Sequence, residues 1–144
     1  MVASLKEMKQ YKNTAVFKRY EKEFLNNKLT AEQAFYGVIQ YLWLCKKHEM
    51  DKKENPNNDA FNFVCGVYPE MREIDDMWHT FLLFTKEYAD FCANYFGEFM
   101  HHVPETEDNP SPKLTDTEFS RYLSYIYDNL GEATVRIWFS DLID

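Results

Sequence analysis

Residues 73–104 read EIDDMWHTFLLFTKEYADFCANYFGEFMHHVP, and this stretch carries most of the information about fold and site. It holds three of the four histidines, one of the three cysteines, two adjacent aspartates and a run of aromatic residues. Its apolar residues recur at helical spacing, and side chains that can bind a metal are interleaved with them. The stretch therefore predicts helices that carry a buried polar site.

Two helical segments are expected here. The first runs from about Glu70 to Phe84, after Pro69, because proline disfavours helical geometry in the residue before it. The second, which could be continuous with the first, covers residues 85–96 and stops at Gly97, a residue suited to the left-handed position that ends many helices.

Helical patterns and polar loops alternate through the rest of the chain. Further amphipathic stripes lie at residues 17–25, 31–45, 119–130 and 135–142. Two Thr-x-x-Gln/Glu capping boxes, at residues 30–33 and 115–118, place the starts of two helices. Residues 51–60 and 103–114 have loop composition, and residues 61–68 are compatible with a short strand, a helical turn or a packed loop.

The fold class follows from these patterns and the composition. The chain has 144 residues, 45% of them hydrophobic and 17% aromatic, which is enough for a well-packed core without disulfides or metal. We predict an all-α protein with a single domain over residues 1–144, about five to six helices, and at most one short strand pair or extended loop.

The charge and the cysteines limit the classes of partner and compartment. A net charge of −8 opposes direct nucleic-acid binding, which needs a basic face, and suits a basic protein partner. Three widely spaced cysteines without a CxxC motif indicate a reduced protein. The N-terminus lacks the apolar core of a signal peptide, and no apolar run is long enough to span a bilayer. A cytoplasmic protein without membrane contact is expected.

The candidate site starts from Asp75 and His79. With about 100° between successive helical residues, these two side chains lie one turn apart at the edge of the apolar face, whereas Asp76 points further toward solvent. Cys92 in the next helix and His102 after Gly97 could meet them. Imidazole, thiolate and carboxylate are zinc ligands, and an Asp–His pair also suits non-haem iron. We predict zinc or iron on His79, Cys92, His102 and Asp75.

Several alternatives stay open. Asp75 could orient His79 as an outer carboxylate, or the pair could only stabilise its helix. Cys92 on an apolar stripe is often a small buried hydrophobe, and it could also pair with His79 or His102 as a nucleophile, although it does not lie at a helix N-terminus. His48, among charged residues, is expected to be solvated. The sequence identifies no reaction.

The order D-x-x-W-H-T, then Tyr88, Cys92, Gly97 and His102, resembles the glycine-rich domain-containing protein-like family. The resemblance nominates these positions, with Asp75, Trp78 and His79, as a shared site, and implies no reaction. Phe81 stands where plant-type members often have a second histidine, and the glycine-rich tail is absent. The chain looks like a compact, bacterial-type version of the family.

Two functions from different classes follow. The first is a small helical protein whose His/Cys/Asp site binds zinc or iron. The second is an acidic interaction or inhibitor protein, of the immunity or anti-defence type, whose polar cluster is purely structural. The second rests on the net charge and on aromatic residues in excess of what the core needs.

Overall fold

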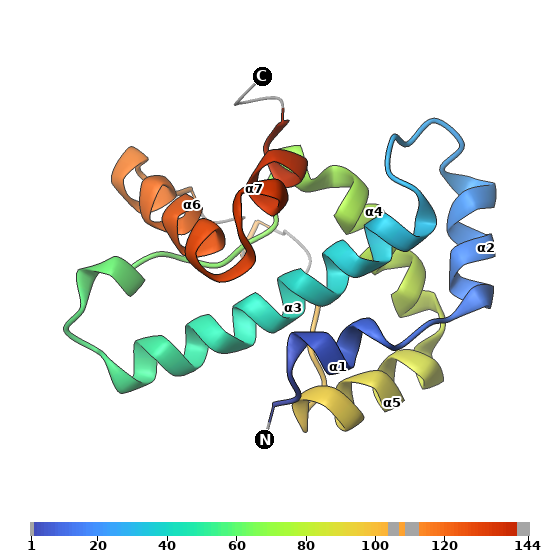
Figure 1. Ribbon diagram of the computed structural model, residues 1–144, viewed down its shortest axis with the longest axis horizontal. Coiled ribbons are helices and arrows are strands. Elements are labelled where there is room, and N and C mark those ends of the chain that lie inside the picture. Colours follow the sequence, from blue (N-terminus) through green and yellow to red (C-terminus); the bar gives the residue numbers. More distant parts are fainter. Residues whose placement is uncertain (1, 104–106, 109–112, 141–144) are drawn as a thin grey trace. The chain divides into compact units, whose positions relative to one another are not determined.

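Figure 1 shows the computed structural model, which describes residues 2–103, 107–108 and 113–140. Within these ranges the chain forms α-helices and two 3-10 turns and contains no β-strand, so the prediction of an all-α fold is confirmed. In chain order the elements are α1 (Leu5–Lys9), α2 (Thr14–Glu23), α3 (Ala31–Glu54), η1 (Asp59–Phe61), η2 (Pro69–Met71), α4 (Arg72–Leu83), α5 (Thr85–Phe96), α6 (Asp116–Leu130) and α7 (Glu132–Trp138).

The helices differ from the prediction in a few places. The helix α1 was not expected, although Ser4 and Glu7 form a capping box that marks its start. The helix α3 extends to Glu54, beyond the start of the loop predicted at residue 51. Residues 62–68 form a loop, which is one of the three alternatives left open for residues 61–68. Parts of the predicted loop at residues 103–114 and of the predicted amphipathic stripe at residues 135–142 lie outside the described residues.

The chain divides into two compact units. The first comprises Met1–Trp43 and Met71–Met100, and the second comprises Leu44–Glu70 and His101–Asp144. A single domain over residues 1–144 stays a prediction.

In the first unit, α4 packs against α2 and α5. The loop after α2 is fixed to α4 because the Glu73 carboxylate accepts hydrogen bonds from the backbone N–H groups of Lys28 and Leu29, at 3.0 and 2.8 Å. Gly37 lets α3 approach α4 closely: a Cβ atom on this residue would lie 2.9 Å from the Ile74 side chain. Aromatic rings fill the remaining interior, among them Tyr11, Phe35, Phe81 and Phe91.

In the second unit, α6 packs against α7 and η1. The predicted capping box at the start of α6 is confirmed, since Thr115 and Glu118 each bond the other's backbone N–H. Side chains of α6 hold the loop at residues 62–68: the Tyr122 hydroxyl donates to the Gly66 carbonyl at 2.8 Å, and Arg121 donates to the Asn62 carbonyl at 3.3 Å. These bonds satisfy carbonyl groups that a strand ladder would otherwise pair.

Candidate functional site

Asp75 and His79 lie side by side on α4, as their spacing predicts. His79 Nδ1 is 3.4 Å from Asp75 Oδ2 and 2.8 Å from the Asp75 backbone oxygen. The side chains are 56% and 29% exposed, respectively, so the pair lies at the solvent-accessible edge of the helix. Each of the two residues offers a ligand atom within 4.8 Å of the other's, a separation that one ion can bridge.

The contact with the Asp75 backbone oxygen determines which nitrogen of the His79 ring donates a hydrogen bond. A carbonyl oxygen can only accept a hydrogen bond, so Nδ1 of His79 carries the proton that it donates to Asp75. In the neutral ring the lone pair is then on Nε2, the nitrogen that would bind a metal. Backbone orientation of the non-ligating nitrogen is a common feature of metal-binding histidines.

Asp76 does not point freely into solvent, so that prediction is wrong. Its Oδ2 accepts a hydrogen bond from Asn27 Nδ2 at 3.1 Å and lies 3.8 Å from Arg72 Nη1. Its side chain is only 18% exposed, less than that of Asp75. The loop after α2 covers this side of α4, and the periodicity of α4 alone carries no information about that loop.

A buried hydrogen-bond chain connects two of the motif positions, Trp78 and Tyr88, with the backbone of Met100. Trp78 Nε1–H donates to the Tyr88 hydroxyl at 3.0 Å, and that hydroxyl donates to the Met100 carbonyl at 2.5 Å. Burial raises the pKa of Tyr88 far above its ordinary value, so the phenol stays a proton donor. At Gly97 the backbone has φ +73°, which ends α5 as predicted and turns the chain toward Met100.

Cys92 is completely buried. Burial raises the pKa of its thiol, against the opposing effect of hydrogen bonds with the Met100 backbone and the Tyr88 hydroxyl. A thiol in this setting is protonated at neutral pH and a weak nucleophile. These contacts agree with the interpretation of Cys92 as a small buried hydrophobe, and its role as a ligand stays a prediction.

The two histidines near the end of the predicted segment belong to the second unit. His101 is exposed and His102 is half-buried. The approach of His102 to Asp75 and His79 stays a prediction.

His48, predicted to be solvated, is buried with 7% of its surface exposed. Its ring stacks on Phe63 with 4.1 Å between centroids, and its Nε2 lies 2.9 Å from the Phe61 carbonyl oxygen. Burial is the main cause that lowers the pKa of His48. The residue continues the apolar stripe of α3 through Tyr41 and Leu44, a signal that the charged neighbours obscured.

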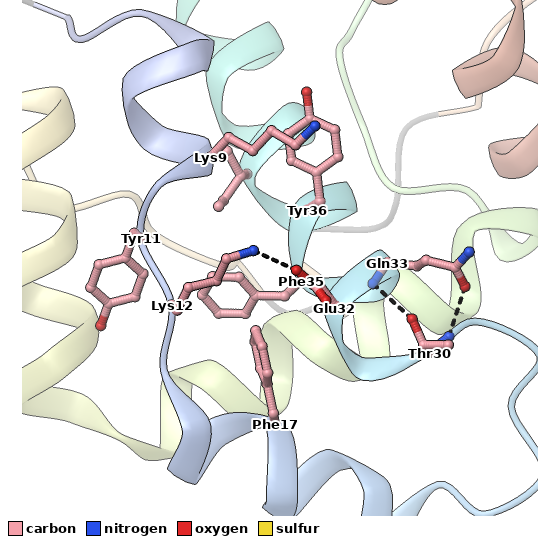
Figure 2. Close-up of a pocket in the computed structure, with 10 residues that line it drawn as sticks. Lys9, Tyr11, Lys12, Phe17, Thr30, Glu32, Gln33, Phe35 and Tyr36 are labelled. Carbon is pink, nitrogen blue, oxygen red and sulfur yellow. Dashed lines mark hydrogen bonds and ion pairs between the residues drawn. The ribbon is translucent and has the colours of Figure 1, made fainter.

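The first unit also contains a pocket of about 260 Å³ between the N-terminal segment and the start of α3 (Figure 2). Tyr11, Phe17 and Phe35 contribute its aromatic walls. Lys12 Nζ pairs with Glu32 Oε1 at 2.5 Å beside it. No predicted site residue lines this pocket, and its volume is below the roughly 300–1,000 Å³ of ordinary ligand pockets.

The comparisons with known proteins give one match. A family model described as UCP032817-like matches residues 67–125, which is less than half of the chain. The matched range contains all four predicted ligands, and its description states no activity. No curated protein and no solved structure matches the chain. The resemblance to the glycine-rich domain-containing protein-like family stays a prediction.

In the part of the chain that the structure describes, no helix combines the length and the apolar character needed to cross a membrane.

Proposed function

We propose that this chain is a helical metal-binding protein in which Asp75, His79 and His102 hold a zinc or ferrous ion. The observation that carries the proposal is the Asp75–His79 pair. A backbone carbonyl accepts the Nδ1 proton of the imidazole, so Nε2 is the nitrogen that we propose as the ligand atom. The pair is accessible to an ion from solvent because His79 is more than half exposed.

The donor set suits either ion. One carboxylate and two imidazoles are found at zinc sites and at non-haem iron sites. Three protein ligands leave at least one coordination position for water or a substrate, which is the arrangement of a catalytic centre. The bound ion would act as a Lewis acid at that position, and Asp75 would supply negative charge and help to orient His79.

Chain connectivity links His102 to the end of the first unit. Met100 belongs to the same unit as α4, and Tyr88 holds its carbonyl group. Two residues of extended chain cover at most about 7 Å, so the Cα atom of His102 lies within that distance of the Cα atom of Met100. The Trp78–Tyr88–Met100 hydrogen bonds would then help to position the chain segment that carries this ligand.

The test is a calorimetric titration of metal-free protein with Zn²⁺, and with Fe²⁺ in the absence of oxygen. The proposal predicts one ion per chain, with affinity lowered about 10-fold or more in His79→Ala and in His102→Ala. His101→Ala is the matched control, because it removes an exposed neighbouring imidazole, and it should bind like the unsubstituted protein. Equal affinity in all four proteins would refute the proposed ligand set.

The alternative, an acidic interaction or inhibitor protein in the cytoplasm, is supported by the net charge of −8. The second argument for this alternative, a surplus of aromatic residues, has less support. Among the described residues, the exposed aromatic side chains are those of Phe99 and Tyr127, and the other aromatic residues are at least partly buried. Capture of a basic protein whose binding weakens steeply with added salt would favour this alternative. Neither function requires contact with nucleic acid.

A further inference from the structure

Cys45 on α3 and Cys65 in the loop at residues 62–68 bring their sulfur atoms together within the second unit. The two Sγ atoms are 3.0 Å apart, with the Cys45 thiol donating toward Cys65. A disulfide bond measures about 2.05 Å, so an approach of roughly 1 Å would form one. Both residues are half-buried, whereas Cys92 is completely buried.

The packing around the thiols holds them in this position. On one side of Cys65, Phe63 stacks on His48, which lies one turn after Cys45 on α3. On the other side, the Gly66 carbonyl accepts a hydrogen bond from the Tyr122 hydroxyl at 2.8 Å. These two contacts are made by groups other than the sulfur atoms, although Tyr122 also hydrogen-bonds the Cys65 thiol, so they would hold the loop at residues 62–68 against α3 in both the reduced and the oxidised protein.

We propose that Cys45 and Cys65 are a site of reversible oxidation by a low-molecular-weight disulfide such as oxidised glutathione. One cysteine thiolate attacks a sulfur of the glutathione disulfide, forms a mixed disulfide and releases one glutathione thiolate, which takes up a proton. The second cysteine, as its thiolate, attacks the protein sulfur of that mixed disulfide and releases the second glutathione. Two protein thiols are oxidised, and one glutathione disulfide is reduced to two glutathione molecules.

The environment of Cys65 sets the conditions for this reaction. The hydrogen bond with Cys45 and burial both raise the pKa of the Cys65 thiol. Since the thiolate is the attacking species, formation of the bond should accelerate as the pH rises above neutrality. The product would tie α3 covalently to the loop at residues 62–68, independently of the metal site proposed above.

The sequence allows a direct test, because trypsin places the three cysteines in separate peptides. Cleavage after Lys28, Lys46 and Lys53 separates Cys45 from Cys65, and cleavage after Lys86 separates Cys92 from both. Native protein is incubated with oxidised glutathione, remaining thiols are blocked with iodoacetamide, and the peptides are identified by mass spectrometry. A second sample is treated in the same way in concentrated urea.

The native sample should lose two of its three thiols and yield one cross-linked species, which joins the peptides of Cys45 and Cys65. The urea sample should also contain cross-links to Cys92. In Cys45→Ser, Cys65 should retain glutathione as a mixed disulfide, whereas Cys92→Ala should behave like the unsubstituted protein. Native protein that keeps three thiols, accumulates only mixed disulfides, or cross-links through Cys92 would overturn the proposal, and none of these results depends on a variant that must fold.

Discussion

The Tyr88 hydroxyl connects Trp78 with Met100 by hydrogen bonds, so its removal should lower the free energy of unfolding. Tyr88→Phe deprives the Trp78 indole N–H and the Met100 carbonyl of their shared partner inside the protein. Unsatisfied buried polar groups cost about 1–3 kcal/mol. We expect the free energy of unfolding, measured by urea denaturation, to fall by about that amount.

Tyr127 provides the matched control, since its side chain is 56% exposed. Tyr127→Phe should change the free energy of unfolding by less than about 0.5 kcal/mol. Equal losses in the two variants would contradict the hydrogen-bond chain. If the proposed site is correct, Tyr88→Phe should also weaken metal binding, because Met100 positions the chain just before His102.

His48 makes stability depend on pH in a defined direction. Burial favours its neutral form, so its pKa in the folded protein lies below the ordinary value of 6.5. When the pH falls below 6.5, the unfolded chain binds a proton that the folded protein does not bind. The free energy of unfolding therefore decreases until the pH reaches the folded-state pKa. The stabilisation that comes from the neutral His48 ring is fully present above the pKa of the unfolded chain. The free energy of unfolding should decrease between about pH 7.5 and about pH 5.5.

The comparison that isolates this effect uses His48→Phe, which keeps a ring against Phe63 and cannot titrate. Loss of the bond to the Phe61 carbonyl can lower its stability at every pH, so the slope between the two pH values is the quantity to compare. The slope should become shallower in His48→Phe and stay unchanged in His101→Gln, where an exposed histidine is replaced. An unchanged slope in His48→Phe would assign the pH dependence to other groups.

Among the helices, the contact of α3 with α4 gives the sharpest prediction. Gly37→Ala would place a methyl group 2.9 Å from Ile74 Cγ1. Overpacking typically costs about 1–3 kcal/mol, against a gain of about 1 kcal/mol from the better helix propensity of alanine. The variant should be less stable than the unsubstituted protein in thermal unfolding.

A double substitution separates the two effects. In an Ile74→Ala background the clash is absent, so Gly37→Ala should be neutral or stabilising through helix propensity alone. If Gly37→Ala lowers stability equally in both backgrounds, the close approach to Ile74 does not explain the glycine.

Helix ends that depend on local chemistry could be predicted from the sequence. The capping box at the start of α6 and Gly97 at the end of α5 each involve a few neighbouring residues, and both occur as expected. The pairing of Asp75 with His79 is also local, because it spans one helical turn. The surroundings of Asp76 and His48 could not be predicted in this way, since each is covered by a segment distant in sequence.

At the level of the whole chain, composition and periodicity were sufficient for the all-α class, and the division into two units was not visible in them. The four predicted ligands lie within a stretch of 28 residues, so they could be named from the sequence. Which of their side chains are buried and which are accessible depends on packing between segments, which the sequence does not reveal. Cys92 is completely buried, whereas His79 is exposed. Likewise, Cys45 and Cys65 are 20 residues apart, and no short motif indicates that their sulfur atoms are neighbours.

Metal binding should be visible in the stability of the entire protein. A ligand present at about 100 times its dissociation constant stabilises the folded state by about 2.7 kcal/mol. We expect a chelator to lower the melting temperature of metal-loaded protein and to leave that of His79→Ala unchanged. A chelator that shifts both proteins equally would indicate metal bound elsewhere.

The most direct test of the metal site is elemental analysis of untagged protein by mass spectrometry, with His79→Ala, His102→Ala and His101→Ala prepared in parallel. The proposal predicts zinc or iron at close to one ion per chain in the unsubstituted protein and in His101→Ala, and loss of that ion in the other two variants. Absence of metal from all four proteins, or retention of the ion in both His79→Ala and His102→Ala, would contradict it.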